Sequence, residues 1–484
     1  MKIILEGNDL FMAVHETLVC LWPEEHHGTE DGEENGVVYA ALSAGNGVVS
    51  AHARVLRGGR EQQAAFSLPL EKTGGYEEKR ICTRALKTAV YRACVVLLPE
   101  KPQWGAMSGV KPAKPLRQMF PDEIDPVEAD HILEDIYDIA PRRRALTIEC
   151  AQKARRMERL QRKNSVSVYI GIPFCPSKCV YCSFVSSTTA RSGHLIEPYL
   201  NGLTQEIRAA GEMLRREGLA IDSLYIGGGT PTALSEEPFE RLLTEVENAL
   251  PKPLEYTVEA GRPETITPGK LESMARHGVG RISINPQTFE AEVLKAVGRM
   301  HSPQQVIEAY EAARRIGAFE INMDLIAGLP GDGEEGLLRS VDTVIGLAPE
   351  NITVHCLARK KGSPLRFGKQ GELPHEILDE AHDRIRAAGY APYYLYRQKY
   401  SAGNLENVGF ARGETLCRYN ILMMEELCDV VALGAGGVSK FCADGGRSIH
   451  RLTNPKYPQE YIENAAEIAL RKKMLQIKTE NNGR

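Results

Sequence analysis

Three of the eleven cysteines fall within a span of eight residues, and their spacing is the strongest chemical signal in the sequence. Cys175, Cys179 and Cys182 follow one another at steps of four and three residues, directly after a strand-like stretch. Thiolates are soft ligands that suit iron–sulfur clusters. A loop that leaves a strand end can wrap three sulfurs around one cube, and three protein ligands leave one iron open. The spacing therefore predicts a 4Fe–4S cluster with one open iron.

The open iron indicates what chemistry such a site would perform. S-adenosylmethionine (SAM) can chelate it through its amino and carboxylate groups. One electron from the cluster would then cleave the sulfonium and give a 5′-deoxyadenosyl radical, which abstracts hydrogen from an unactivated carbon. Two plainer interpretations stay open here, because Cys179 and Cys182 alone could form a redox dithiol or half of a zinc site. A zinc site needs a second cysteine pair and a ferredoxin-type cluster a fourth nearby cysteine, and the sequence supplies neither.

Further polar residues recur where predicted strands end. The glycine-rich segment 227–232 (Gly-Gly-Gly-Thr-Pro-Thr) could bring the backbone close to a ligand, or could only be a tight turn. Glu259, Gln287 and Asp324 lie at or near the ends of the next three strands. Each could merely cap a helix, but three in succession favour ligand contacts at one barrel mouth. Arg299 is either a surface arginine or a residue whose guanidinium binds a carboxylate through two hydrogen bonds.

Short strands and amphipathic helices alternate from Ser165 onward, which indicates the scaffold for these residues. The predicted strands are Val166–Ile172, Ser223–Ile226, Glu255–Glu259, Arg281–Asn285, Glu320–Ile326 and Ile352–Cys356. The predicted helices include Tyr199–Arg216, Phe239–Leu250, Pro303–Ile316 and Glu335–Leu347. Six β/α units in a row predict a parallel sheet that closes toward a barrel, with the chemistry at the carboxyl ends of the strands.

The whole chain then divides into four predicted segments. Residues 1–120 mix strand-like and helix-like stretches (49–56 and 77–98) and form an N-terminal α+β domain of unknown role. Residues 121–164 form a helical connector, with one charged helical stretch over 127–163. The (β/α)6 core covers residues 165–370. Residues 371–484 form a C-terminal α/β extension that covers the substrate and carries a tyrosine-rich strand at 390–396.

Composition excludes several classes of protein. The formal net charge is −5, so the basic field typical of nucleic-acid binders is absent. No secretory signal is visible, and the longest weakly polar stretch, 430–438, is about half the ~20 residues of a membrane helix. Eight cysteines stand singly, as free thiols do in a reducing compartment. We expect a cytoplasmic protein without a membrane span or a nucleic-acid partner.

Five motifs together resemble the radical SAM oxygen-independent coproporphyrinogen III oxidase family. They are Ile-Pro-Phe-Cys at 172–175, Gly-Gly-Gly-Thr-Pro-Thr at 227–232, Pro-Gln-Thr-Phe at 286–289, Gly-Arg-Met-His-Ser at 298–302 and Asp-Leu-Ile-Ala-Gly-Leu-Pro-Gly at 324–331. The resemblance is greatest to the coproporphyrinogen dehydrogenase HemZ branch, through Gly171, Val258–Pro263 and Tyr393–Tyr400. It implies a partial (β/α)6 radical SAM barrel, a 4Fe–4S cluster, SAM, and an electron donor such as flavodoxin or ferredoxin.

The resemblance also implies two positions for SAM. One SAM on the cluster would be held by Tyr169, Gly228, Glu259, Ala358 and Val438. A second position, for another SAM or for the substrate, would be lined by Tyr181, Gly229, Thr230, Gln287, Arg299 and Asp324. The implied reaction belongs to anaerobic haem (porphyrin) biosynthesis: oxidative decarboxylation of two propionates of coproporphyrinogen III to vinyl groups, which gives protoporphyrinogen IX.

Two departures from the family pattern keep other functions open. The well-studied oxidases carry a further cysteine where this chain has Phe184, and a histidine where it has Gly171. Family members that lack these features include haem chaperones and enzymes that modify haem with SAM. A haem-binding delivery protein and a SAM-dependent haem-modifying enzyme are therefore the alternatives.

A porphyrinogen substrate would need cations near the barrel mouth, because it carries several propionates. A guanidinium pairs with a carboxylate through two parallel hydrogen bonds. Candidates at or just beyond strand ends or in the tyrosine-rich segment are Arg299, Arg359, Arg397 and Lys399.

Overall fold

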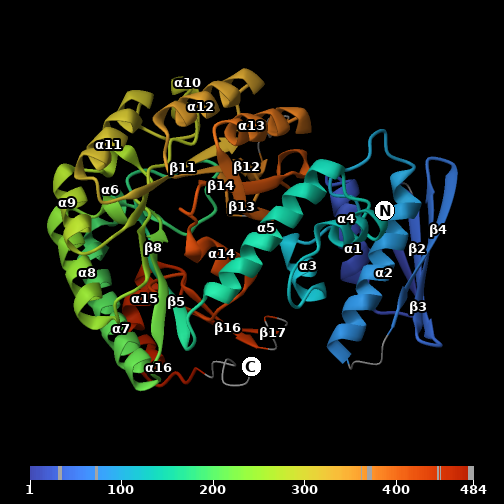
Figure 1. Ribbon diagram of the computed structural model, residues 1–484, viewed down its shortest axis with the longest axis horizontal. Coiled ribbons are helices and arrows are strands. Elements are labelled where there is room, and N and C mark those ends of the chain that lie inside the picture. Colours follow the sequence, from blue (N-terminus) through green and yellow to red (C-terminus); the bar gives the residue numbers. More distant parts are fainter. Residues whose placement is uncertain are drawn as a thin grey trace. The chain divides into compact units, whose positions relative to one another are not determined.

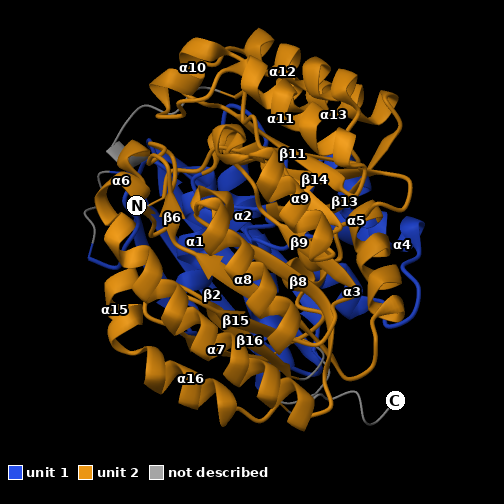
Figure 2. Ribbon diagram, turned by 90° about the vertical axis from the view of Figure 1, so that its left-hand side faces the viewer, with its two compact units in different colours: residues 1–148, 397–400 blue, residues 149–396, 401–484 orange. Residues whose placement is uncertain are grey.

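The computed structural model describes residues 1–30, 35–70, 75–360, 362–367, 373–443, 446 and 448–477. The chain forms two compact units, one of residues 1–148 with 397–400 and one of residues 149–396 with 401–484 (Figure 2). The division falls inside the helix Pro141–Leu160 (α5). The finer sequence-based division into four segments stays a prediction.

The N-terminal unit is built on one four-stranded sheet of order β1-β2-β3-β4. Its strands are Lys2–Glu6 (β1), Val37–Gly45 (β2), Val48–Arg57 (β3) and Arg60–Pro69 (β4). β1 runs parallel to β2, and the other pairs are antiparallel. Helices Phe11–Leu21 (α1) and Gly75–Val95 (α2) pack on the sheet and enclose a core that includes Val14, Leu18, Val38 and Leu86. This mixture confirms the strand-like and helix-like stretches expected in this part of the chain.

The predicted single helical stretch at 127–163 is wrong in its middle. The structure has two helices, Pro126–Asp135 (α4) and α5, separated by residues 136–140. Proline is favoured in the first turn of a helix because it has no N–H to lose there, and each of these helices begins with one. Asp125 caps α4 by accepting the backbone N–H groups of Val127 and Glu128. A further helix, Ala113–Met119 (α3), precedes them.

Among its described residues, the second unit holds an open sheet of eleven strands whose centre is the predicted parallel core. The order is β13-β14-β12-β11-β10-β9-β8-β5-β15-β16-β17. The core strands are Ser165–Ile172 (β5), Ala220–Gly228 (β8), Glu255–Val258 (β9), Arg281–Ser283 (β10), Glu320–Ala327 (β11) and Asn351–Cys356 (β12). All six are parallel and lie in sequence order. Because the sheet does not close on itself, the expected partial barrel is confirmed.

Strands from the C-terminal part extend both edges of the core. Val430–Leu433 (β15) runs parallel to β5 and is followed by the antiparallel strands Val438–Ala443 (β16) and Ser448–Thr453 (β17). At the other edge, Glu406–Arg412 (β14) runs antiparallel to β12, with Tyr390–Arg397 (β13) beyond it. The last zone of the chain thus completes the sheet on both sides.

Helices form an arc outside the core strands (Figure 1). They are Ile196–Arg216 (α7), Glu236–Ala249 (α8), Pro268–Arg276 (α9), Ala291–Ala296 (α10), Pro303–Ile316 (α11), Glu334–Leu347 (α12) and His375–Ala387 (α13). The remaining helices are Thr189–Ser192 (α6), Arg418–Glu425 (α14), Pro458–Glu463 (α15) and Ala465–Lys473 (α16). Apolar residues at helical spacing, such as Leu200, Leu203 and Ile207 of α7, are buried.

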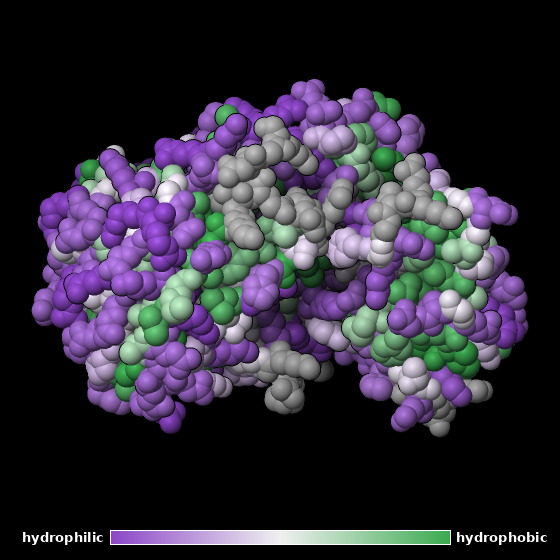
Figure 3. Space-filling view, turned by 90° about the horizontal axis from the view of Figure 1, so that it is seen from below, coloured by the Kyte–Doolittle hydropathy of each residue, from purple (hydrophilic) through white to green (hydrophobic). Residues whose placement is uncertain are grey.

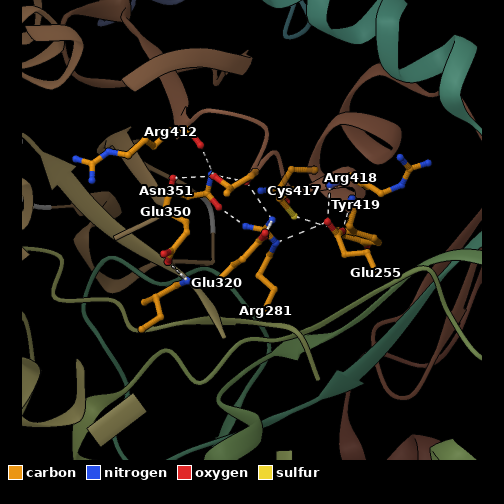
Figure 4. Close-up of polar contacts among 12 residues, drawn as sticks. Glu255, Arg281, Glu320, Glu350, Asn351, Arg412, Cys417, Arg418 and Tyr419 are labelled. Atoms are coloured by element: carbon orange, nitrogen blue, oxygen red, sulfur yellow. Dashed lines mark hydrogen bonds and ion pairs between the residues drawn. The ribbon is translucent and has the colours of Figure 1, made fainter. Parts of the chain in front are cut away.

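A polar network ties together the starts of the core strands (Figure 4). Arg281, the first residue of β10, donates to Asn351 of β12, to Glu320 of β11 and, at 3.0 Å, to the carbonyl of Thr415. Glu255, the first residue of β9, accepts the backbone N–H groups of Arg418 and Tyr419 at 2.7 and 2.9 Å. The carboxyl ends of the same strands stay available for a site.

Hydrophilic residues cover most of the molecular face in Figure 3, with smaller apolar areas between them. Among the described residues, none of the helices combines the length and the apolar character that crossing a bilayer requires.

Candidate cluster and SAM site

A short pair of strands closes the base of the cysteine loop. Phe174–Cys175 (β6) follows β5 and pairs in parallel with Ser187–Thr188 (β7), so the loop from 175 to 188 leaves and returns at one point. Inside it, the Val180 N–H donates to Val297 at 3.1 Å. The loop therefore stands at the carboxyl end of β5, as predicted from the sequence.

The three thiols lie close enough to influence one another's charge. Burial raises the pKa of the Cys182 thiol, and the neighbouring Cys179, Cys175 and Glu259 raise it further. Burial likewise raises the pKa of Cys175, against a hydroxyl hydrogen bond from Thr230. All three cysteines are free thiols. Bound metal would deprotonate these thiols, because it replaces the proton that burial favours.

The donor set suits a cluster better than a single ion. Within the part of the chain that the structure describes, no three His, Cys, Asp or Glu side chains converge on one metal-ion position. Three sulfurs that each hold a different iron of a cube need not converge on one point. Three thiols on one loop therefore fit a 4Fe–4S cluster.

The glycine segment lies directly against the cysteine loop. The Gly229 N–H donates to Ile172 and the Thr230 N–H to Phe174, both at 2.7 Å. A Cβ on Gly229 would stand 3.0 Å from the Cys175 sulfur and 2.5 Å from the Phe174 carbonyl. Gly228 has φ +107°, and a Cβ there would come within 3.2 Å of the Tyr169 hydroxyl. The backbone of the glycine segment thus packs so closely against the cysteine loop that a side chain at either glycine would clash.

Two acidic side chains, Glu259 beside the glycine segment and its neighbour Asp324, differ in the direction of their pKa shifts. Burial and the nearby Asp324 raise the pKa of Glu259 to about 8, against a hydrogen bond from Gly228. Burial would also raise the pKa of Asp324, but hydrogen bonds from His355, Asn322 and Thr353 lower it. Without a ligand, Glu259 is mainly protonated at neutral pH while Asp324 is ionised.

Tyr181 and Arg299 form a second group beside the cysteine loop. The Arg299 Nε donates to the Tyr181 hydroxyl at 3.0 Å, and its Nη1 donates to the Asn285 carbonyl. Arg299 is only 6% exposed, which overturns the surface-arginine interpretation.

Gln287 bonds through its backbone N–H to the Asp324 carbonyl at 2.9 Å. It has φ +68°, and its buried Oε1 finds no partner among the described residues. A strained backbone and an unpartnered acceptor are features of ligand sites.

Ala358 and Val438 are placed by backbone pairing at the two edges of the parallel core. Ala358 follows β12 and forms a bridge with Ser401. Val438 begins β16, directly after the glycine loop at 434–437. That loop packs on β5, where a Cβ on Gly434 would lie 2.5 Å from the Gly171 carbonyl. No described contact joins Ala358 or Val438 to the cysteine loop.

Comparison with known proteins decides the family. Residues 169–344 match the family model of the radical SAM superfamily. Over 482 residues, 35% are identical to the oxygen-independent coproporphyrinogen-III oxidase-like protein HemZ of Bacillus subtilis (strain 168), across 96% of this chain and 95% of that protein. The chain belongs to the HemZ-like family of radical SAM proteins. A 4Fe–4S cluster and SAM are therefore its cofactors, as the cysteine spacing predicted.

Other relatives share parts of this radical SAM protein. The oxygen-independent coproporphyrinogen III oxidase of Pseudomonas aeruginosa is 32% identical over 57% of this chain and 61% of its own. The heme chaperone HemW of Escherichia coli (strain K12) is 31% identical over 62% of this chain and 76% of its own. The solved coproporphyrinogen III oxidase (HemN) from Escherichia coli superposes with a TM-score of 0.51 at 23% identity, covering 65% of this chain and 73% of that one, and shows the same fold.

Sequence reasoning missed several residues of the radical SAM site. Arg262 donates to the Cys179 sulfur at 3.0 Å. It lies in the segment 258–263, which contributed to the resemblance to the HemZ branch, but no pattern in the sequence indicated a function for Arg262. His355 stands 3.7 Å from Asp324. The rings of Tyr169, Tyr225 and Tyr419 form a stacked group, in which Tyr169 lies 6.3 Å from each of the other two rings. Strand-end position could have indicated His355, whereas nothing local connects Tyr419 to a strand 250 residues earlier.

Two of the four cations considered for propionate binding contact residues of the N-terminal unit instead. Arg397 is 4% exposed, donates to the Met107 carbonyl and lies over the Trp104 ring at 5.0 Å. Lys399 pairs with Glu16 at 2.9 Å. Both belong to the N-terminal unit. Arg299 lies in the site, and Arg359 follows Ala358 in a half-buried position.

Proposed function

We propose that this radical SAM protein is an oxidoreductase of anaerobic haem biosynthesis, which converts propionates of coproporphyrinogen III to vinyl groups and forms protoporphyrinogen IX. The observation that carries the proposal is the similarity to an oxidase-like HemZ protein over 96% of the chain. The HemW alignment covers 62% of it. The similarity to HemZ therefore includes sequence that the similarity to HemW leaves out.

The residues divide between two tasks in this proposal. Cys175, Cys179 and Cys182 would hold the cluster. Tyr169, Gly228, Glu259, Ala358 and Val438 would hold the SAM on it, and bound together these cofactors supply the agent that abstracts hydrogen. The second position, for another SAM or the substrate, would be lined by Tyr181, Gly229, Thr230, Gln287, Arg299 and Asp324.

The geometry supports particular roles for two of these groups. The protonated Glu259 carboxyl can exchange its proton for a hydrogen bond from the amino group of SAM, because its pKa of about 8 lies close to neutrality. The Arg299 guanidinium, fixed by Tyr181 and Asn285, offers a cation to a carboxylate. Loss of hydrogen from the propionate β-carbon, then of CO2 and one electron, would leave the vinyl group.

The reaction needs further partners. One electron per round must enter from a donor such as flavodoxin or ferredoxin, and one must leave to an acceptor. We place the protein in the cytoplasm in this proposal, because the cluster needs a reducing compartment.

Haem binding or haem modification is the second candidate, and a specific observation favours it. The position of the oxidases' further cysteine is taken by Phe184, which is 62% exposed. Gly171 stands where the oxidases carry a histidine. A Cβ at this position would lie 3.2 Å from the Ala435 carbonyl, so the glycine loop leaves little room for a side chain. The chain thus lacks two side chains of the oxidases and is similar to a heme chaperone, so haem delivery or SAM-dependent haem modification is the alternative.

Anaerobic turnover separates these functions. The reconstituted protein is incubated with SAM, a reductant and either coproporphyrinogen III or haem, and the products are identified by mass spectrometry, with Cys179→Ala as the cluster-free control. Vinyl porphyrin that requires the cluster supports the oxidase. Tight haem binding without turnover supports a delivery protein, and a modified haem supports the third function; either result without vinyl porphyrin overturns the oxidase proposal.

A further inference from the structure

Two of the three cysteine sulfurs meet side-chain hydrogen-bond donors of different charge. Cys175 lies 3.6 Å from the neutral hydroxyl of Thr230. Cys179, which is 8% exposed, lies 3.0 Å from the Nη1 of Arg262, which is itself 3% exposed. A buried cation therefore contacts the sulfur of Cys179.

The guanidinium of Arg262 is fixed from three sides. Its Nη2 donates to the Ser177 hydroxyl, two residues before Cys179, and its Nε donates to Glu264 at 3.0 Å. Glu264 in turn lies 3.2 Å from His301. Although burial would raise the pKa of Glu264, His301 and Arg262 lower it to about 2, so this carboxylate is ionised. The guanidinium is thus held between a cysteine sulfur and a carboxylate.

Such a pair has a defined effect on a cluster held by Cys179. Reduction adds one negative charge, which spreads onto the thiolate ligands. A hydrogen bond and a positive charge at a ligand sulfur stabilise the reduced form, and burial strengthens both effects. A nearby carboxylate acts in the opposite direction.

We propose that Arg262 and Glu264 set the reduction potential of the cluster as positioning residues that act through Cys179, with Arg262 raising the potential and Glu264 lowering it. The inference rests on the cluster and is independent of the porphyrin substrate. It applies equally to an oxidase, a haem-modifying enzyme or a delivery protein.

The test is an anaerobic redox titration of the reconstituted full chain without SAM, with the reduced cluster measured by electron paramagnetic resonance. Arg262→Gln should lower the ratio of reduced to oxidised cluster at a fixed potential about tenfold, which is a shift of ~59 mV for one electron. Arg262→Lys keeps the positive charge but cannot form all three hydrogen bonds of the guanidinium, so it should shift the potential less than Arg262→Gln does. Glu264→Gln should shift it to more positive values. Arg208→Gln, which removes an exposed partner of Glu245, should leave it unchanged.

The opposite signs separate a redox role from a structural one. If the substitutions only loosened the loop, the reduction potentials of Arg262→Gln and Glu264→Gln would shift in the same direction, and that result overturns the proposal. Unchanged potentials in both variants overturn it as well. Iron content is measured in parallel, and failure of both Arg262 variants to assemble a cluster would show a role in assembly instead. Turnover of coproporphyrinogen is not part of the test, so the two proposals fail independently.

Discussion

The ammonium of Lys472 lies 3.5 Å from the carboxylate of Glu206, and both side chains are fully buried. Glu206, on α7, also accepts the backbone N–H of Gly434 at 2.8 Å and the Tyr461 hydroxyl at 2.6 Å. Lys472, on α16, donates to the Ala432 carbonyl at 2.8 Å. The pair therefore joins the last helix to β15 and to the glycine loop that precedes Val438.

Removal of Lys472 should destabilise the second unit strongly. Lys472→Met leaves the Glu206 carboxylate buried without its cation, which costs about 3–5 kcal/mol in unfolding free energy. Denaturant unfolding measures this loss. The neighbouring Lys473 is the matched control, because it forms an exposed pair with Glu212 at 2.9 Å. Lys473→Met should cost less than about 1 kcal/mol. An equal loss of unfolding free energy in the two variants would contradict a stabilising role for the buried Lys472–Glu206 pair.

Each cysteine of the loop should be required for the cluster. Cys182→Ala leaves two sulfurs, so the reconstituted variant should lose its visible iron–sulfur absorption and all SAM cleavage. Iron content, absorption and release of 5′-deoxyadenosine are the measurements. Cys442→Ala, which removes one of the single cysteines, should keep all three properties. A Cys182→Ala protein that cleaves SAM at the wild-type rate would refute the assignment.

A side chain at Gly228 should weaken SAM binding while the cluster still assembles. Its Cβ would stand 3.2 Å from the Tyr169 hydroxyl and from the Ile172 N–H, and φ +107° disfavours any other residue. For Gly228→Val we expect at least a tenfold loss of SAM affinity by equilibrium binding, with unchanged iron content. Gly346→Ala, on exposed helix surface, is the control. Loss of the cluster itself would show that the glycine segment is structural.

The raised pKa of Glu259 predicts how its contribution to stability depends on pH. With a folded-state pKa of about 8, the folded protein binds more protons at this group than the unfolded chain does between about pH 4.5 and 8. Its contribution to stability is therefore present below this window and is lost as the pH rises through it. Between pH 6 and 8 the wild-type protein should therefore lose about 2 kcal/mol of unfolding free energy relative to Glu259→Gln, measured by unfolding of the cluster-free protein. A difference that does not change with pH would contradict the raised pKa.

Local sequence pattern was enough to predict the radical SAM core. The strand runs from Ser165 to Cys356 are buried and separated by amphipathic helices, so each could be recognised without its neighbours. The cysteine loop and the glycine segment come from consecutive β/α units, and their contact follows from strand order. Asp324 lies three residues before the end of β11, close to its predicted place.

Pairings between distant segments could not be predicted in the same way. β15 lies beside β5 although some 260 residues separate them, and the periodicity of a short buried strand does not specify its partner. The Arg262 contact was missed because nothing in the sequence sets the direction of a side chain after a strand. Arg397 ends the tyrosine-rich strand β13, yet its contacts belong to the N-terminal unit.

Arg397 should therefore support stability and not propionate binding. Arg397→Ala removes a buried guanidinium from the Trp104 ring and the Met107 carbonyl, which should cost about 2–4 kcal/mol and lower the unfolding temperature. Arg54, which lies over Tyr39 at 4.2 Å with its side chain 44% exposed, is the control, and Arg54→Ala should cost less than about 1 kcal/mol. At a temperature where the Arg397→Ala protein is folded, its porphyrin affinity should equal that of the wild type. A weaker affinity at unchanged stability would instead restore Arg397 as a propionate ligand.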